Sequence, residues 1–372
     1  MQSLLLPITL QSLSIATWMV LGFIGALFVG SIVLPGLDRR GYALPNGDTK
    51  TYKLTGMTLF FLTHIAVGIA TFGFGISLTP ILQHFWSLFI VANVVAVIWS
   101  LAIYAYGKRR GPVLKSPVGH DLRWPGWVKD LWFGNELNPT WLGVDLKMFM
   151  YVPSLIGVYL IVLAFPYAQY NRHGFITPQM WCFVGFWFTY LFTLYAKEEN
   201  LLSMWDVMSE NFGFMLVWGD LVYLPFLYAL PGFWIVDETT PFTALQCMAL
   251  MVFYLFGLIL HREPNWQKHR FKSDPQVRIW GKPARTIGGK LLISGWWGIG
   301  RKLNYTGEII IYLAFALCAG ISHWQPFLLP LSLFLLLTQR AARDDKKCRE
   351  KYGPLWTKYC RVAKFRMFPF IY

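Results

Sequence analysis

The sequence predicts an all-α, polytopic transmembrane helical bundle of about nine or ten spans. Hydrophobic residues make up 55% of the 372 residues and charged residues only 14%, whereas a soluble domain carries about 25% charged residues. Apolar runs of about 20 residues, the length that crosses the hydrocarbon core of a bilayer, recur along the whole chain. Strands of a membrane β-barrel would be about ten residues long with alternating polarity, whereas these runs are longer and do not alternate.

Nine apolar runs are read as membrane spans, with eight or ten as the alternatives. They lie near residues 13–34, 54–77, 83–106, 148–169, 177–196, 211–235, 241–260, 304–322 and 325–338. The first run is uncharged in front and too long for the apolar core of a cleavable signal, so we expect it to stay as an anchor. This predicts a multi-pass integral membrane protein, in the endoplasmic reticulum of a eukaryote or the inner membrane of a bacterium.

The basic residues are concentrated between alternate spans. The chain has 33 Lys and Arg against 19 Asp and Glu, a formal charge of +14, which in a soluble protein would suggest nucleic acid. Here the positive-inside rule explains the excess, because it gathers cytoplasmic charge near membrane spans. The segments expected in the cytoplasm contain Arg39 to Lys53, Lys108 to Lys115, Arg262 to Lys302, and the tail after Arg340. We therefore expect the C-terminus inside, the N-terminus outside and no nucleic-acid partner.

The motifs divide the chain into two parts of one continuous bundle. Residues 1–260 form a transmembrane domain, and in residues 261–372 short apolar segments alternate with dense polar motifs. The five cysteines and seven histidines are scattered without paired spacing, so neither a disulfide framework nor a metal site is indicated.

Two polar features interrupt the apolar part of the chain. The long segment 108–147, between the third and fourth spans, contains Gly134-Asn135-Glu136-Leu137-Asn138-Pro139. We expect this segment to be ordered, because long ordered loops are more often functional than decorative. Asp220 lies inside the sixth span. An acid at membrane depth is costly and indicates a functional role, unless it caps a broken helix or pairs with a neighbouring Arg.

Three segments resemble the sterol reductase family, which reduces carbon–carbon double bonds of sterol intermediates and includes the membrane domain of the lamin B receptor. The segment from Arg340 to Gly353 is similar to the family signature R-x-x-R-D-x-x-x-C-x-x-K-Y-G, although Gln339 replaces the His that usually precedes it. The segment from Lys290 to Gly307 is similar to K-L-L-x-S-G-W-W-G followed by R-x-x-N-Y-x-G. The third segment is Gly134 to Pro139, with Thr140 where the family has Arg.

This resemblance implies that the chain uses NADPH and binds it through the part after residue 260. The family's cofactor contacts fall, motif by motif, on Lys268, Lys272, Leu292, Trp297, Asn304, Tyr305, Asp344, Cys348, Arg349, Glu350, Lys351, Tyr352 and Tyr359. A pyrophosphate with an extra ribose phosphate also needs several cations. Candidates for this role are Lys268, Lys272, Arg340, Arg343, Arg349 and Lys351. A basic collar attracted to anionic lipid would explain the lysines, but not Asn304, Trp297 or Asp344.

Reduction of an isolated ring double bond requires a proton on one carbon and a hydride on the other. The protein must place both donors, stabilise the intermediate cation and exclude water. Tyr190, in the aromatic run of the fifth span, is the first candidate for the proton donor because it can donate without carrying a buried charge. Glu198, Asp220 and Tyr228 are the alternatives, and an ordinary membrane aromatic is the other reading of Tyr190. The sterol would enter from the lipid phase, and no obligate protein partner is evident.

The sequence leaves alternative functions open. Trp296 and Trp297 favour reduction of the C14 double bond over the C7 double bond, since C7 reductases often carry Phe-Trp there. A membrane methyltransferase similar to the isoprenylcysteine carboxyl methyltransferases would use S-adenosylmethionine, but has no counterpart of Gly134 to Pro139. A non-catalytic receptor or scaffold is the third reading.

Overall fold

The computed structural model describes residues 4–44, 46–111, 114–115, 122–369 and 371. Part of the predicted ordered segment 108–147, at residues 112–113 and 116–121, lies outside this description. The chain forms two compact units. The first comprises residues 1–176 and 187–237, and the second comprises residues 177–186 and 238–372. The division predicted at residue 260 follows the motifs of the chain rather than its compactness, and it stays a prediction.

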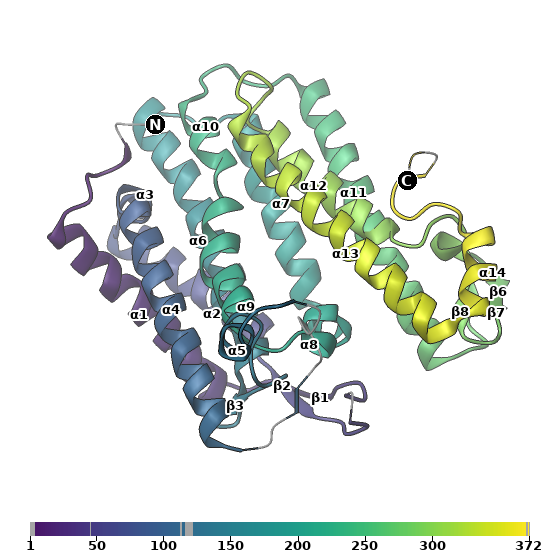
Figure 1. Ribbon diagram of the computed structural model, residues 1–372. Coiled ribbons are helices and arrows are strands. Elements are labelled where there is room, and N and C mark those ends of the chain that lie inside the picture. The colour runs from purple at the N-terminus through teal and green to yellow at the C-terminus, as the bar shows by residue number, and fades with distance from the viewer. Residues whose placement is uncertain (1–3, 45, 112–113, 116–121, 370, 372) are drawn as a thin grey trace. The chain divides into compact units, whose positions relative to one another are not determined.

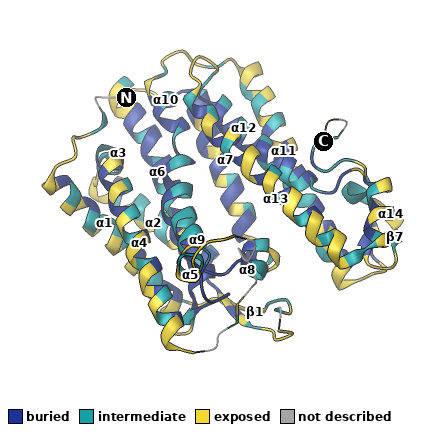
Figure 2. Ribbon diagram, in the orientation of Figure 1, coloured by how far each residue is buried: buried dark blue, intermediate teal, exposed yellow. Residues whose placement is uncertain are grey.

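The first unit is built around a long central helix. Its helices are α1 (Leu10–Val33), α2 (Gly56–Gly68) with its π-helical continuation η2 (Ile69–Gly73), α3 (Thr79–Gln83), α4 (Phe85–Arg109), α5 (Gly126–Trp132), α6 (Leu146–His173), η3 (Glu198–Ser203), α8 (Trp205–Ser209), α9 (Phe214–Trp218), η4 (Gly219–Leu227) and α10 (Pro231–Asp237). Helix α6 packs against α1, α2, α3, α10 and η4. Most residues in the apolar stretch of this helix are buried (Figure 2).

Helix α6 begins and ends with sequence-encoded caps. The side chain of Asp145 accepts a hydrogen bond from the backbone N–H of Met148 at 2.9 Å, which satisfies one of the free donors at the helix start. Gly174 ends the helix at φ +77°, a left-handed conformation that costs glycine little. Two short antiparallel pairs, β1 (Leu37–Arg40) with β2 (Thr51–Leu54) and β3 (Thr140–Trp141) with β4 (Val144–Asp145), lie at loops of this unit.

The second unit contains the longest helix and the polar C-terminal part. Its helices are α11 (Ala244–Ser273), η5 (Gly295–Gly298), α12 (Leu303–Leu317), η6 (Gln325–Phe327), α13 (Leu328–Tyr352) and α14 (Pro354–Val362). Between α11 and η5 lie the hairpins β5 (Arg278–Ile279) with β6 (Lys282–Pro283) and β7 (Thr286–Ile287) with β8 (Leu291–Leu292). Helices α11, α12 and α13 run alongside one another (Figure 1).

Two glycines allow α11 and α12 to approach closely. A Cβ atom on Gly307 would meet the backbone of Gly257 and His261, and a Cβ on Gly257 would meet Ile310. Small residues at such crossings let helices pack backbone to backbone within a bilayer. This contact fixes the start of α12 against the polar end of α11.

The all-α prediction is confirmed, since helices dominate and the strands are short hairpins. Among the described residues, six helices are long and apolar enough to cross a bilayer: Leu10–Val33, Gly56–Gly73, Phe85–Arg109, Leu146–His173, Phe214–Asp237 and Ala244–Ser273. The other predicted spans coincide with α7 (Pro178–Tyr195), α12 and α13. Helix α12 is apolar but only 15 residues long, so the count of nine spans stays a prediction.

Candidate functional site

A polar cluster in the second unit contains many of the predicted cofactor residues. Lys268 and Lys272 lie one helical turn apart near the end of α11. The Lys268 ammonium lies 5.3 Å from the ring centroid of Trp297. That ring is held in place because its Nε1–H donates to the carbonyl of Pro264 at 2.8 Å. The Tyr359 hydroxyl donates to the carbonyl of Trp297 at 3.3 Å, which attaches α14 to the same point.

The centre of the cluster is an ion pair between α13 and the residue that precedes α12. Lys302 forms a salt bridge with Asp344. The Cys348 thiol donates to the same carboxylate at 3.7 Å, and the Lys302 ammonium lies 5.7 Å from the ring centroid of Tyr305. Lys268 interacts electrostatically with both Lys302 and Asp344. Two ammonium groups therefore surround one carboxylate.

Burial and pairing act against each other on these charges. Burial by itself would raise the pKa of Asp344, but Lys302 holds that pKa below its ordinary value. Burial would likewise lower the pKa of Lys302, but Asp344 raises it above the ordinary value. Burial and the nearby carboxylate raise the pKa of Cys348 to about 11. At neutral pH the pair is charged and the thiol keeps its proton.

Asn304 stands at the start of α12 beside this ion pair. Its backbone carbonyl accepts a hydrogen bond from the His261 ring nitrogen Nδ1 at 3.0 Å, and its side-chain Nδ2 donates to Asn265 at 3.4 Å. Its buried Oδ1 has no hydrogen-bond partner among the described residues, and neither has the buried Nε1 of Trp296. Unsatisfied buried polar atoms cost about 1–3 kcal/mol each. A ligand with matching donors and acceptors would recover that energy.

The α13 candidates divide between two faces of the helix. Arg340, Asp344, Cys348 and Tyr352 recur every fourth residue and share one face. Arg340 interacts electrostatically with Tyr305, which places this face at the cluster. The other predicted residues of the helix, namely Arg343, Arg349, Glu350 and Lys351, are exposed. Lys351 remains close, because it interacts with Lys272 and its ammonium lies 5.4 Å from the ring centroid of Tyr352.

Leu292 has a different environment from the charged candidates. It is buried in a small apolar cluster with Phe271, Val277 and Ile279, against which Trp297 packs. Leu292 therefore belongs to the apolar cluster against which Trp297 packs.

The sequence reasoning missed the anchor that holds the C-terminal tail. Asp345 is buried and pairs with Arg301 at 3.5 Å and with Arg366 and Arg349 at 3.4 Å each. Arg301 also donates to the carbonyls of Ala363 and Lys364 at 2.8 and 3.1 Å. These contacts connect the segment before α12 with the tail after α14. Lys302, next to Arg301, was also missed, because its partner becomes apparent only when α13 packs against α12.

Tyr190, the predicted proton donor, lies in the first unit. Its side chain is buried, and its ring meets that of Trp187 edge-on with centroids 6.0 Å apart. Trp187 in turn lies 6.4 Å from Tyr228, whose ring meets that of Tyr223 at 5.5 Å. Tyr190 therefore belongs to an aromatic group that includes Tyr228, one of the alternative donors. Asp220, another alternative, lies in the π-helical segment η4.

Glu198, the remaining alternative, has a clear structural role. Its two carboxylate oxygens accept hydrogen bonds from the backbone N–H of Gly56 at 3.1 and 3.0 Å, at the first residue of α2. A carboxylate at a helix N-terminus satisfies free donors and complements the helix dipole. Burial raises the pKa of Glu198 to about 7, while the N–H groups of Gly56 and Met57 lower it. Glu198 thus acts as a distant cap of α2.

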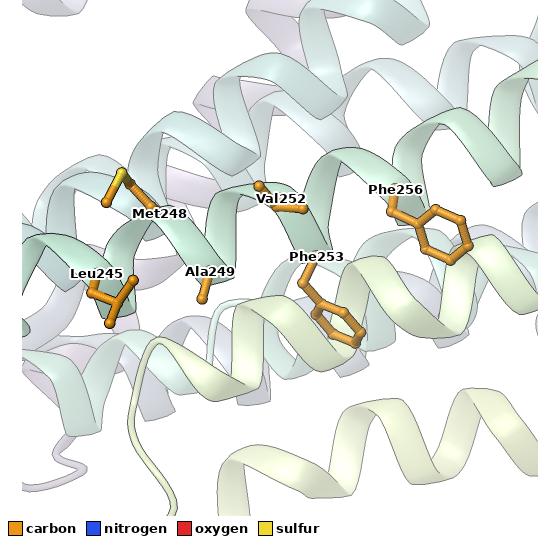
Figure 3. Close-up of a pocket in the computed structure, with 6 residues that line it drawn as sticks. All are labelled: Leu245, Met248, Ala249, Val252, Phe253 and Phe256. Carbon is orange, nitrogen blue, oxygen red and sulfur yellow. The ribbon is translucent and has the colours of Figure 1, made fainter.

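An apolar groove of about 550 Å³ runs along α11 (Figure 3). Its lining side chains are Leu245, Met248, Ala249, Val252, Phe253 and Phe256. None of them can form a hydrogen bond with a dinucleotide, and the first cofactor candidate, Lys268, lies about three turns further along the helix. The groove suits the hydrocarbon of a bilayer rather than a charged ligand.

The fold and the cluster define a polytopic helical membrane protein with a basic, aromatic-lined polar site in its C-terminal unit. Residues 5–372 match the model of the ergosterol biosynthesis ERG4/ERG24 family, and the chain belongs to this family of sterol reductases. It is therefore an oxidoreductase of sterol biosynthesis.

Individual relatives agree with this family assignment. The chain is 34% identical to a Delta(14)-sterol reductase of Arabidopsis thaliana over 99% of its length and 98% of the relative. It is 35% identical to a Delta(14)-sterol reductase of the bacterium Methylotuvimicrobium alcaliphilum, over 96% of the chain and 84% of the relative. A probable 7-dehydrocholesterol reductase of Acanthamoeba polyphaga mimivirus is 30% identical over 90% of the chain and 75% of the relative.

Proposed function

We propose that this protein reduces the C14=C15 double bond of a sterol with NADPH. The observation that carries the cofactor assignment is the cluster around Asp344, where Lys268 and Lys302 flank the carboxylate. The unsatisfied Oδ1 of Asn304 lies at the start of the same helix as Tyr305. Relatives named Delta(14)-sterol reductase in both a plant and a bacterium support the bond assignment.

The residues of the cluster fit a phosphorylated dinucleotide. Lys268, Lys272 and Lys351 would bind phosphate groups. Arg340, whose guanidinium can form two parallel hydrogen bonds with a phosphate, would add a further cation. Asn304 would accept a hydrogen bond from a carboxamide or ribose hydroxyl through its free Oδ1. When bound, NADPH would supply the hydride equivalent for the reaction. Trp297, held by Pro264 and Tyr359, offers a fixed aromatic face beside these groups.

The protein's own chemical contribution is the proton. The Tyr190 hydroxyl would donate it to one alkene carbon, and the surrounding rings of Trp187 and Tyr228 would stabilise the tertiary cation on the sterol. A buried phenol suits this task, because it is neutral before it donates. The apolar bundle around Tyr190 would exclude water that could otherwise capture the cation.

We propose a topology in which the cofactor cluster faces the cytoplasm. The basic segments between alternate spans support this orientation by the positive-inside rule. Residues 340–372 would then form a cytoplasmic cap, and the sterol would arrive from the lipid phase. Protease digestion of sealed, right-side-out vesicles tests the orientation. Rapid cleavage of the tail in intact vesicles would contradict it.

The bond assignment is tested with two diene sterols. Purified protein and NADPH are mixed with a delta8,14 diene or, separately, a delta5,7 diene, and the loss of each diene's ultraviolet absorbance is followed. We expect consumption of the first diene only. Consumption of only the second would favour a C7 reductase, consistent with the 7-dehydrocholesterol reductase relative. Consumption of neither would contradict the proposed activity.

A further inference from the structure

Three cysteines far apart in the sequence converge at one end of the second unit. Cys182 lies in the first turns of α7, Cys247 in the first turn of α11 and Cys318 at the C-terminal end of α12. Cys182 and Cys247 interact electrostatically with each other. Cys318 is buried and interacts electrostatically with both. No step of the proposed reaction uses these residues.

A series of contacts holds the first part of α7 in register with α11. The Gln179 side chain accepts from the backbone N–H of Phe242 at 3.0 Å. Further along both helices, the Phe186 ring stacks on the Tyr254 ring with centroids 4.2 Å apart, and the Tyr254 hydroxyl donates to the Phe186 carbonyl at 2.7 Å. Cys182 and Cys247 lie between these two contacts. The neighbouring contacts therefore fix the pair as opposing residues of two parallel helices.

From this geometry we infer that Cys182 and Cys247 form a redox-convertible pair that can close into a disulfide joining α7 to α11. Two cysteines held opposite each other by the contacts on either side of them need little backbone movement to form an S–S bond. Both thiols are partly exposed, whereas Cys318 is buried, so a small oxidant that enters the bilayer reaches the pair first. In the proposed topology this end of the helices lies on the side of the membrane opposite the cytoplasm. Disulfides persist on that side.

The oxidation balances with hydrogen peroxide as the two-electron oxidant. One thiolate attacks a peroxide oxygen, the O–O bond breaks, and a sulfenic acid and one water form. The second thiol then displaces the sulfenic oxygen as a second water, and the S–S bond forms. The pair loses two electrons and two protons, and the two water molecules contain all of them.

The disulfide would constrain the helix that contains the proposed proton donor. Tyr190 lies about two turns beyond Cys182 on α7. The bond would also close a long loop of chain, which stabilises a protein chiefly by restricting its unfolded state. We therefore expect a higher thermal denaturation midpoint for the oxidised protein than for the reduced protein, reversed by dithiothreitol.

The test uses the purified full-length protein treated with hydrogen peroxide, blocked with a maleimide and analysed by peptide mass spectrometry. We expect a peptide linked through Cys182 and Cys247 in the wild type, and the same link in the control variants Cys318→Ser and Cys360→Ser. Cys182→Ser and Cys247→Ser should lose both the link and the peroxide-dependent rise in the denaturation midpoint. A link through Cys318, or full labelling of both thiols after peroxide, would overturn the inference. Neither outcome depends on the proposed sterol activity.

Discussion

The ammonium of Lys302 pairs with the carboxylate of Asp344, and each side chain is only about one-sixth exposed, at 15% and 16%. The pair joins the segment just before α12 to the middle of α13. Because each charge compensates the burial of the other, loss of one partner leaves an unpaired charge in a largely dry site. The two residues are therefore both part of the candidate cofactor site and part of what holds it together.

Replacing Asp344 by Asn should destabilise the protein as well as weaken cofactor binding. Removing one member of a buried ion pair costs on the order of 3 kcal/mol, because the remaining charge is left buried. The double variant Asp344→Asn with Lys302→Met should recover much of the thermal stability but not the NADPH affinity. A double-mutant cycle of denaturation midpoints measures the coupling. Additive midpoints would show that the two charges do not depend on each other.

Replacing Asn304 by Ala should weaken NADPH binding about tenfold with little loss of stability. The Oδ1 atom has no partner to lose within the described protein, and one hydrogen bond to a ligand contributes on the order of 1 kcal/mol. Asn265→Ala is the matched control, since Asn265 is the partner of Asn304 on α11. Titration of each purified variant with NADPH gives the two affinities. Equal losses in both variants would point to the Asn–Asn contact instead.

Replacing Lys268 or Lys272 by Ala should reduce the preference for NADPH over NADH. The extra ribose phosphate of NADPH needs cations beyond those that a pyrophosphate requires. Each variant should lose about tenfold in NADPH affinity and much less in NADH affinity. Lys282→Ala provides the control, because Lys282 is an exposed lysine of the hairpin β5–β6 in the same unit. If the wild type binds both cofactors equally, the cations serve another purpose.

The apolar pattern predicted the helices well but not their internal hydrogen-bond register. The run 211–235 was predicted as one span, and the structure builds it from α9, the π-helical η4 and α10. Pro225 and Pro231 interrupt the regular ladder of bonds there. Hydropathy reports which residues avoid water, and it contains no information on whether a carbonyl bonds four or five residues ahead.

The candidate site was predicted only where a motif named its residues. Lys268, Trp297, Asn304 and Asp344 could be found in this way, and the structure brings them into one cluster. Lys302 could not, because its role depends on the packing of α13 against α12. Glu198 was considered as an alternative proton donor, but its carboxylate caps α2, which begins 142 positions earlier in the chain. Such long-range pairings leave no local signal in a single sequence.

The burial of Glu198 should make stability depend on pH. Its pKa is about 7 in the folded protein, against 4.5 for the free side chain. Between these values the folded state holds a proton that the unfolded state has released, so stability falls as the pH rises from about 4.5 to about 7. Glu198→Gln cannot titrate and should flatten this part of the profile, by at most about 3 kcal/mol. Denaturation midpoints of both proteins between pH 4.5 and 8 measure the difference, and parallel profiles would exclude Glu198 as the cause.

Replacing Tyr190 by Phe should abolish most of the turnover while leaving NADPH binding intact. The substitution removes only the hydroxyl, so the edge-on contact with the Trp187 ring remains. Loss of a positioned proton donor slows a reaction by about 10²–10⁴-fold. Tyr228→Phe is the matched control, since Tyr228 lies in the same aromatic group and contacts the same Trp187. Loss of diene absorbance under saturating sterol and NADPH measures the rate of each variant. If Tyr228→Phe is the slower of the two, the proton comes from Tyr228. If both variants keep wild-type turnover, the donor is neither phenol, and Asp220 becomes the residue to replace.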